Sequence, residues 1–196
     1  MNLKKAVRVL TFTVVEPLPG RVLPEMERSV GADEAVRRYK AVVLTTLRQL
    51  HGLSETRIRL VADPDDADEA LRFWLLPRLA DRWESDNGTF RTQGWEIDFG
   101  GGDEGFHIHA RGDIRCPYLG ARWVHAAMIG LERGGHQVVA TTHDGSECFH
   151  ARGRAAGNAA LKPLPQLSLI RNDDEWKEAL ESPLGAALRK AWKEEC

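Results

Sequence analysis

Apolar and polar positions follow one another along the first part of the chain in a pattern that predicts strands and helices in turn. Residues 7–15 are mostly apolar and rich in β-branched side chains, as expected of a buried strand. Side chains then recur at helical spacing as far as residue 50, where His51-Gly52 ends the helix. Residues 57–62 alternate as a second strand, and residues 67–76 form a second helix. This β-α-β-α order favours a parallel sheet with helices on its faces.

The remainder of the chain is less regular. Residues 83–94 are polar and rich in turn formers, and they precede two half-buried strands at 95–99 and 106–110 that flank a glycine-rich loop. The elements expected after them are a helix at 121–133, a strand at 137–141, a turn at Asp144-Gly145, a loop at 152–158, and helices at 173–180 and 184–193. No internal repeat or low-complexity segment interrupts this order. We therefore expect a single domain over residues 1–196.

Composition argues against several classes of protein. Hydrophobic residues make up 42% and charged residues 29%, which is typical of a soluble globular domain. The net charge of −2 argues against a general nucleic-acid binder, since such proteins are more often basic. No apolar run approaches the roughly 18 residues of a membrane span, and the stretch after Lys4-Lys5 has the pattern of a strand and not of a signal peptide. Three widely spaced cysteines predict no disulfide framework and a cytoplasmic location.

The loop after the first strand, residues 16–22, has the composition of a phosphate-binding turn. Gly20 allows the backbone to approach a ligand closely, and Pro19 stiffens that approach. Arg21 offers a planar fork of donors that suits a phosphate. An ordinary Pro/Gly turn with a solvated arginine has the same composition. The loop alone therefore does not distinguish a phosphate-binding turn from an ordinary one.

Four short patterns, in order along the chain, resemble the bacterial nucleotide-diphospho-sugar transferase-like proteins of the glycosyltransferase A-type fold. Residues 15–26 are similar to the family's Lys-Ala-Pro-Val-Pro-Gly-Arg-Val-Lys-Thr-Arg-Leu, and residues 112–119 to a strand end with Gly-Thr-Asp-Cys-Pro-Asp-Leu. Asp144-Gly145 follows a strand as the family's Asp-Gly-Gly-Tyr-Tyr does, and residues 169–176 stand where an acidic segment opens a helix. The resemblance covers most of the chain. It implies a three-layer α/β/α domain with a mostly parallel sheet.

The resemblance also implies roles for particular residues. Pro19, Gly20 and Arg21 would hold the phosphates of a nucleotide or nucleotide sugar. Asp113, allowing a two-residue insertion, would bind Mg²⁺ or Mn²⁺, while Arg115 would pair with phosphate directly. Asp144 would face the acceptor as a catalytic residue, although an Asp-Gly turn needs an aspartate for its own geometry.

Departures from the family pattern bear on its chemistry. Val15, Leu23 and Glu25 stand where the family has cations, and without a gap Arg115 and Arg171 replace acidic metal ligands. The helix usual between the glycine-rich loop and the metal strand is missing after residue 105. We therefore expect a nucleotide-sugar-dependent glycosyl or nucleotidyl transferase with a degenerate metal site. The alternative is a catalytically inactive binding or assembly module, and a homo-oligomer is compatible with either.

Histidines suggest a third and less favoured interpretation, a metal-binding protein. His107 and His109 are two residues apart on a strand, which places both imidazoles on one face. His143, His150 and Cys148 would complete a zinc or iron site. The simpler interpretation is a pair of histidines on the polar face of an edge strand, and Cys148 has no evident base partner and is interpreted as structural.

Overall fold

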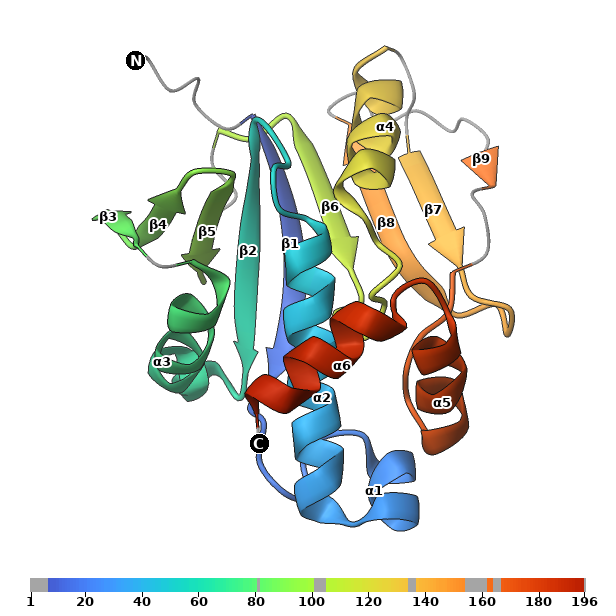
Figure 1. Ribbon diagram of the computed structural model, residues 1–196. Coiled ribbons are helices and arrows are strands. Elements are labelled where there is room, and N and C mark those ends of the chain that lie inside the picture. The colour runs from blue at the N-terminus through green and yellow to red at the C-terminus, as the bar shows by residue number, and fades with distance from the viewer. Residues whose placement is uncertain are drawn as a thin grey trace.

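A mixed sheet forms the framework of the protein (Figure 1). The computed structural model describes residues 7–80, 82–100, 105–133, 137–153, 162–163 and 167–195. Within these residues the sheet has nine strands in the order β3-β4-β5-β2-β1-β6-β8-β7-β9. The strands are β1 (Arg8–Val15), β2 (Thr56–Asp63), β3 (Glu84–Asp86), β4 (Thr89–Thr92), β5 (Trp95–Phe99), β6 (Ile108–Gly112), β7 (Gln137–Thr141), β8 (Glu147–Gly153) and β9 (Lys162–Pro163).

Parallel strands make up the centre of this sheet. β1 pairs in parallel with β2 on one side and with β6 on the other, and β2 pairs in parallel with β5. Antiparallel strands are added outside this centre, because β4 pairs with β5, and β8 pairs with both β6 and β7. The prediction of an α/β fold with strands at residues 7–15, 57–62, 95–99 and 137–141 is confirmed.

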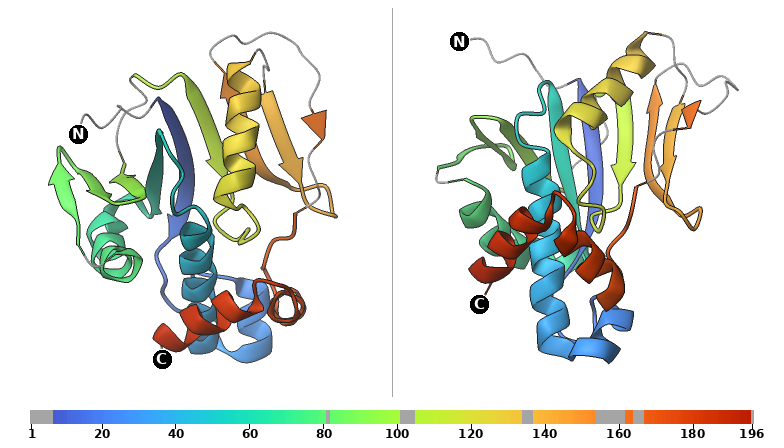
Figure 2. Two further views of the ribbon diagram at one scale, coloured as in Figure 1. Left: turned by 45° about the horizontal axis from the view of Figure 1, so that its top comes forward. Right: turned by 45° about the vertical axis from the view of Figure 1, so that its right-hand side comes forward.

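The helices pack together against one face of the sheet. They are α1 (Pro24–Val30), α2 (Ala32–Gln49), α3 (Asp68–Leu79), α4 (Ala121–Glu132), α5 (Asp173–Glu181) and α6 (Gly185–Glu194), with a 3₁₀ turn at Asp65–Ala67. α6 crosses α2, as both views in Figure 2 show. Leu10 and Phe12 of β1 share one core cluster with Leu47 of α2, Leu71 of α3 and Met128 of α4. None of these helices spans a membrane, since within the described residues no helix is long and apolar enough to do so.

The opposite face of the sheet is polar. Side chains alternate along a strand, so the residues between the core positions, such as Thr11, Arg59 and Arg111, point to this face. A small cluster of Val9 and Phe106 covers part of it. Residues 100–107 connect β5 to β6, and the described ones, 100 and 105–107, are not helical. Among the described residues no second helical layer covers this face.

Several elements were not predicted, and β9 is among them. Residues 83–94 contain the β3–β4 hairpin, whose two-residue turn places Asn87 at φ 47° and Gly88 at φ 77°. β8 begins after the predicted turn at 144–145 and takes in residues 152–153, which were expected to belong to a loop; it pairs on both sides. α1 follows the proline-rich loop and begins at Pro24, which suits the first turn of a helix.

Candidate functional site

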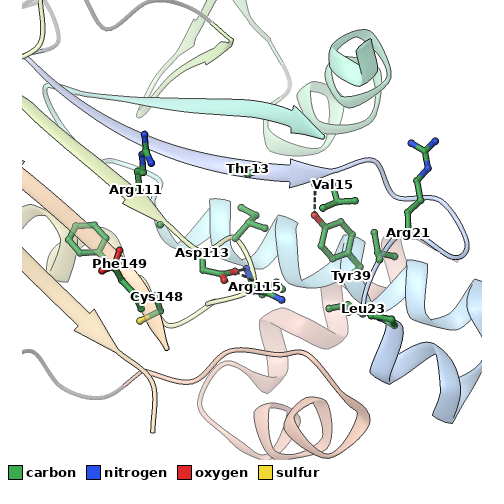
Figure 3. A pocket seen from close by; sticks show the side chains of 15 residues that line it. Thr13, Val15, Arg21, Leu23, Tyr39, Arg111, Asp113, Arg115, Cys148 and Phe149 are labelled. Atoms are coloured by element: carbon green, nitrogen blue, oxygen red, sulfur yellow. Dashed lines mark hydrogen bonds and ion pairs between the residues drawn. The ribbon is translucent and has the colours of Figure 1, made fainter. Parts of the chain in front are cut away.

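A cavity of about 480 Å³ opens at the carboxyl ends of β1 and β6. Ligands of open α/β sheets bind outside the carboxyl ends of the strands, so this is the expected place for a site. The cavity, which we call the cleft, is lined by the end of β1 and the loop after it, the start of α1, Tyr39 of α2, the 111–115 segment and the start of β8. Its polar and charged lining residues are Thr13, Arg21, Tyr39, Arg111, Asp113, Arg115, Glu147 and Cys148 (Figure 3).

Gly112 lets the end of β6 lie directly on the core beneath the cleft. A Cβ atom at this position would lie 2.4 Å from Cε1 of Phe12, whose ring is fully buried. Glycine therefore permits the close approach of β6 to the Phe12 ring. This contact holds the end of β6 close to the core, and the following residues, Asp113 to Arg115, continue from there into the cleft.

Asp113 and Arg115 form an ion pair inside the cleft. Arg115 donates from Nε to Oδ1 of Asp113 at 3.0 Å and from Nη2 to Oδ2 at 2.7 Å, and its backbone N–H also donates to Oδ1 at 2.9 Å. The hydrogen bond to Asp113 raises the pKa of Arg115. Both predicted residues thus lie in the cleft, as expected. However, both oxygens of the carboxylate are already engaged by a cation.

Tyr39 of α2 ties the end of β1 to the helical layer. Its hydroxyl oxygen accepts the backbone N–H of Val15 at 2.9 Å, the contact drawn as a dashed line in Figure 3. The side chain is 2% exposed, and this burial raises the pKa of the phenol. Tyr39 is therefore a neutral wall of the cleft that holds the start of the 16–22 loop in place.

The 16–22 loop contributes less to the cleft than its composition suggested. Gly20 has φ 79°, so the turn does require glycine, but neither Pro19 nor Gly20 lines the cavity. Arg21 lies at the rim, where its Nη1 donates to Oε2 of Glu16 at 2.7 Å. Its side chain is 47% exposed and is directed away from the Asp113–Arg115 pair (Figure 3). The loop is thus a well-formed turn that presents one arginine to the edge of the site.

Asp144 is outside the lining of the cleft. Its carboxylate accepts hydrogen bonds from the hydroxyl of Thr142, from the backbone N–H of Ser146 at 3.0 Å and from Nη1 of Arg171 at 2.5 Å. The Thr142 and Arg171 hydrogen bonds lower the pKa of Asp144. Held ionised by these donors, the carboxylate organises the turn and fixes Arg171.

Arg171 and Arg115 lie on neighbouring segments, because the backbone N–H of Ile170 donates to the carbonyl oxygen of Arg115 at 3.0 Å. The charge of Arg171 opposes the rise in the pKa of Arg115 that the Asp113 hydrogen bond causes. Arginines paired with carboxylates, Arg115 with Asp113 and Arg171 with Asp144 and Glu175, thus occupy the positions where the family resemblance implied acidic metal ligands. Within the described residues, no group of three or more His, Cys, Asp or Glu side chains is placed to hold a metal ion.

Arg111 is a residue of the cleft that the sequence did not single out. Arg111 lines it, and among the described residues its side chain makes no hydrogen bond or ion pair. Glu147 also lines it, and Oε1 of its carboxylate lies 3.2 Å from Nδ1 of His150. Strand alternation gives a signal for Arg111, because Arg111 and Asp113 are two residues apart at the end of β6.

The histidine interpretation gains no support from the described residues. His107 is exposed on the connection before β6, whereas His109 and His150 line a different cavity. Cys148 is buried, and its Sγ donates to the carbonyl oxygen of Ala140 at 3.3 Å. These groups do not converge on one point as metal ligands would.

No protein-family model and no curated protein matches the sequence. Among solved structures, a protein described as a nucleotide-diphospho-sugar transferase from Desulfovibrio desulfuricans G20 matches with a TM-score of 0.68 and 16% identity, over 97% of this chain and 98% of that one. The chain has the nucleotide-diphospho-sugar transferase-like fold. At this identity the likeness shows the fold alone.

Two further solved structures match at lower TM-scores. A 4-diphosphocytidyl-2C-methyl-D-erythritol synthase from Anaerococcus prevotii DSM 20548 gives a TM-score of 0.48 and 10% identity, over 85% of this chain and 91% of that one. A manganese complex of a Mycobacterium tuberculosis H37Rv protein gives 0.44 and 12%, over 89% of this chain and 99% of that one.

Proposed function

We propose that the cleft binds the diphosphate of a nucleotide or nucleotide sugar, and that the protein is a glycosyl or nucleotidyl transferase that uses arginines where its fold relatives would use a metal ion. The observation that carries this proposal is the presence of Arg111 and Arg115 in one cavity at the carboxyl ends of β1 and β6. A planar guanidinium matches two phosphate oxygens, and a diphosphate has enough oxygens for both groups.

A divalent metal fits these residues poorly. Mg²⁺ and Mn²⁺ need oxygen ligands, and Asp113 offers both of its oxygens to Arg115. Asp144 is likewise engaged by a cation, since Nη1 of Arg171 lies 2.5 Å from its Oδ2. We therefore assign the positive charge of the site to the guanidinium groups and derive no step through a metal.

The guanidinium of Arg111 has no hydrogen-bond partner among the described residues and can contact a ligand directly. The guanidinium of Arg115 is already hydrogen-bonded to Asp113. A phosphate oxygen that approaches Arg115 competes with the carboxylate for the same donors. In the absence of a ligand, Asp113 would thus neutralise the positive charge of Arg115, and a bound anion would take its place. This exchange replaces one charge-assisted pair by another, so little free energy is lost when the ligand displaces Asp113.

Glu147 is the candidate general base, in place of the predicted Asp144. It lines the cleft, and its side chain is 53% exposed, whereas Asp144 is outside the lining and fully hydrogen-bonded. In a glycosyl transfer, Glu147 would take the proton of an acceptor hydroxyl as that oxygen attacks the anomeric carbon. The bond from this carbon to the diphosphate breaks, its electron pair leaves on the diphosphate, and Arg111 and Arg115 stabilise the charge.

One observation favours the alternative of a catalytically inactive binding or assembly module. Two of the acidic candidates are neutralised by an adjacent arginine, Asp113 by Arg115 and Asp144 by Arg171. A module of this kind would bind a nucleotide through the same arginines and release no product. Binding and turnover must therefore be measured separately.

Calorimetry with a panel of nucleoside diphosphates and nucleotide sugars, in EDTA and then in Mn²⁺, tests the proposal. We expect binding in EDTA that weakens about tenfold or more in Arg115→Ala and Arg111→Ala, since each loses a charge-assisted contact. Arg122→Ala, an exposed arginine on α4, is the matched control and should bind as wild type. Diphosphate release that stops in Glu147→Gln supports a transferase, and binding without release supports the module. Binding to no member of the panel would contradict both.

A further inference from the structure

A second cavity lies on the face of the sheet that carries no described helix. Its volume is about 420 Å³, and it is floored by β2, β1, β6 and β8. We call it the basic trough and define it by its polar lining residues, Thr11, Arg59, His109, Arg111, His150 and Arg152. Arg111 also lines the cleft, so the two cavities meet at this residue.

Strand register places these side chains in rows across the sheet. Thr11 of β1 lies opposite Arg59 of β2 on one side and Arg111 of β6 on the other, and Arg111 lies opposite His150 of β8. The next row pairs His109 with Arg152. Opposed side chains on neighbouring strands are about 5 Å apart at Cβ, where like charges destabilise a sheet. An assembly of basic groups in register therefore favours an anion between them.

Among the described residues, every ionisable side chain that lines the basic trough is basic, although the whole chain has a net charge of −2. The nearest carboxylate to His150 is that of Glu147, whose Oε1 lies 3.2 Å from Nδ1 of His150. Arg59 is anchored, since its Nε lies 3.3 Å from Oδ1 of the buried Asp98. Arg152 donates from Nε to Nε2 of His150 at 3.2 Å, which leaves its charge without a carboxylate among the described residues. Arg111 likewise has no ion pair there. Two exposed guanidinium groups thus remain for an external anion.

We propose that the basic trough is a second ligand site, which binds the phosphate group or groups of a small molecule. Its volume lies within the range of small-molecule sites, roughly 300–1,000 Å³. Arginine forks and a threonine hydroxyl are suited to phosphate oxygens. Among the described residues no Phe, Tyr or Trp lines it, so only the imidazoles of His109 and His150 could contact a base. A cavity of this size also differs from the extended basic stripe of a nucleic-acid binder. A phosphorylated small molecule is therefore the occupant that its chemistry favours.

Calorimetric titration with inorganic pyrophosphate at fixed ionic strength tests this site. The Arg115→Ala background removes an arginine of the cleft and leaves every residue of the basic trough in place. We expect pyrophosphate to bind in this background and to bind roughly tenfold or more weakly when Arg152→Glu is added. Arg152 is exposed on β8, so the change should not affect folding, and thermal unfolding of each variant verifies this.

The matched control is Arg122→Glu, which makes the same change of charge at an exposed position of α4 on the helical side. Equal weakening by Arg152→Glu and Arg122→Glu would show general electrostatic attraction and would overturn the proposal. Absence of pyrophosphate binding in the Arg115→Ala background would overturn it as well. Failure of nucleotides to bind the cleft, with pyrophosphate binding retained, would reject the proposed function and leave the basic trough standing.

Discussion

The guanidinium of Arg115 donates two hydrogen bonds to the carboxylate of Asp113, from Nε to Oδ1 at 3.0 Å and from Nη2 to Oδ2 at 2.7 Å. Because the carboxylate competes with a ligand for these donors, Asp113→Ala should free the guanidinium. We expect the affinity for a nucleoside diphosphate in EDTA to rise about threefold to tenfold, since a charge-assisted contact is worth more than 1 kcal/mol. Calorimetry measures this change. If Asp113 instead held a metal, the same variant would lose metal-dependent binding.

Gly112 offers a paired test of the cleft floor. In Gly112→Ala the new methyl group would lie 2.4 Å from the Phe12 ring, which cannot move within the core. We expect the free energy of unfolding to fall by about 1–3 kcal/mol, the usual effect of overpacking. Gly130→Ala is the control, because its Cβ meets open space on α4 and should stabilise the helix by roughly 1 kcal/mol. Two changes of equal sign in urea unfolding would contradict this explanation.

Glu195 joins α2, α3 and α6 through a buried carboxylate. It accepts a hydrogen bond from Nε1 of Trp74 at 3.2 Å and pairs with Arg78 and Lys40, with only 2% of its side chain exposed. Glu195→Gln keeps the size of the side chain and removes its charge. The free energy of unfolding should therefore fall by about 3 kcal/mol. The neighbouring Glu194→Gln breaks a more exposed pair with Arg48 and should change stability by less than about 1 kcal/mol.

Asp98 should show an unusual pH dependence. Burial raises its pKa above the ordinary value of 3.8, although Arg59 and Arg57 oppose the rise. A raised pKa means that the folded state binds this proton more tightly than the unfolded state does. The carboxyl therefore stabilises the fold below its ordinary pKa and loses that contribution as the pH rises through the raised value. NMR titration of the Asp98 carboxyl measures the pKa, and a value at or below the ordinary one would contradict the prediction.

Much of the fold followed from the sequence because burial imposes a pattern. β1, β2 and β5 carry apolar side chains toward the helices at alternate positions, and α2 and α4 carry them at helical spacing. The β3–β4 hairpin was missed because its first strand is fully exposed and has no apolar face to detect. Its Asn87-Gly88 turn was the available signal.

The cleft contains only part of the predicted set of site residues. Asp113, Arg115 and Arg21 line it, whereas Pro19, Gly20 and Asp144 do not, and the roles assigned to all of them stay predictions. The sequence does not show which charged side chains form ion pairs with one another. Arg171 binds Asp144 across 27 positions of the chain, and this contact depends on how α5 packs. The role of Arg111 likewise depends on the face of β6 that no described helix covers.

Arg111 stands on the walls of both cavities, so their ligands are thermodynamically linked. An anion that draws this guanidinium into the cleft removes it from the basic trough. Because a coupling free energy is reciprocal, each ligand should weaken the other by the same factor. Calorimetry of a nucleoside diphosphate with and without pyrophosphate should show this antagonism in wild type and independent binding in Arg111→Ala. A single side chain shared by both cavities would thereby let the concentration of a second metabolite set the occupancy of the first site.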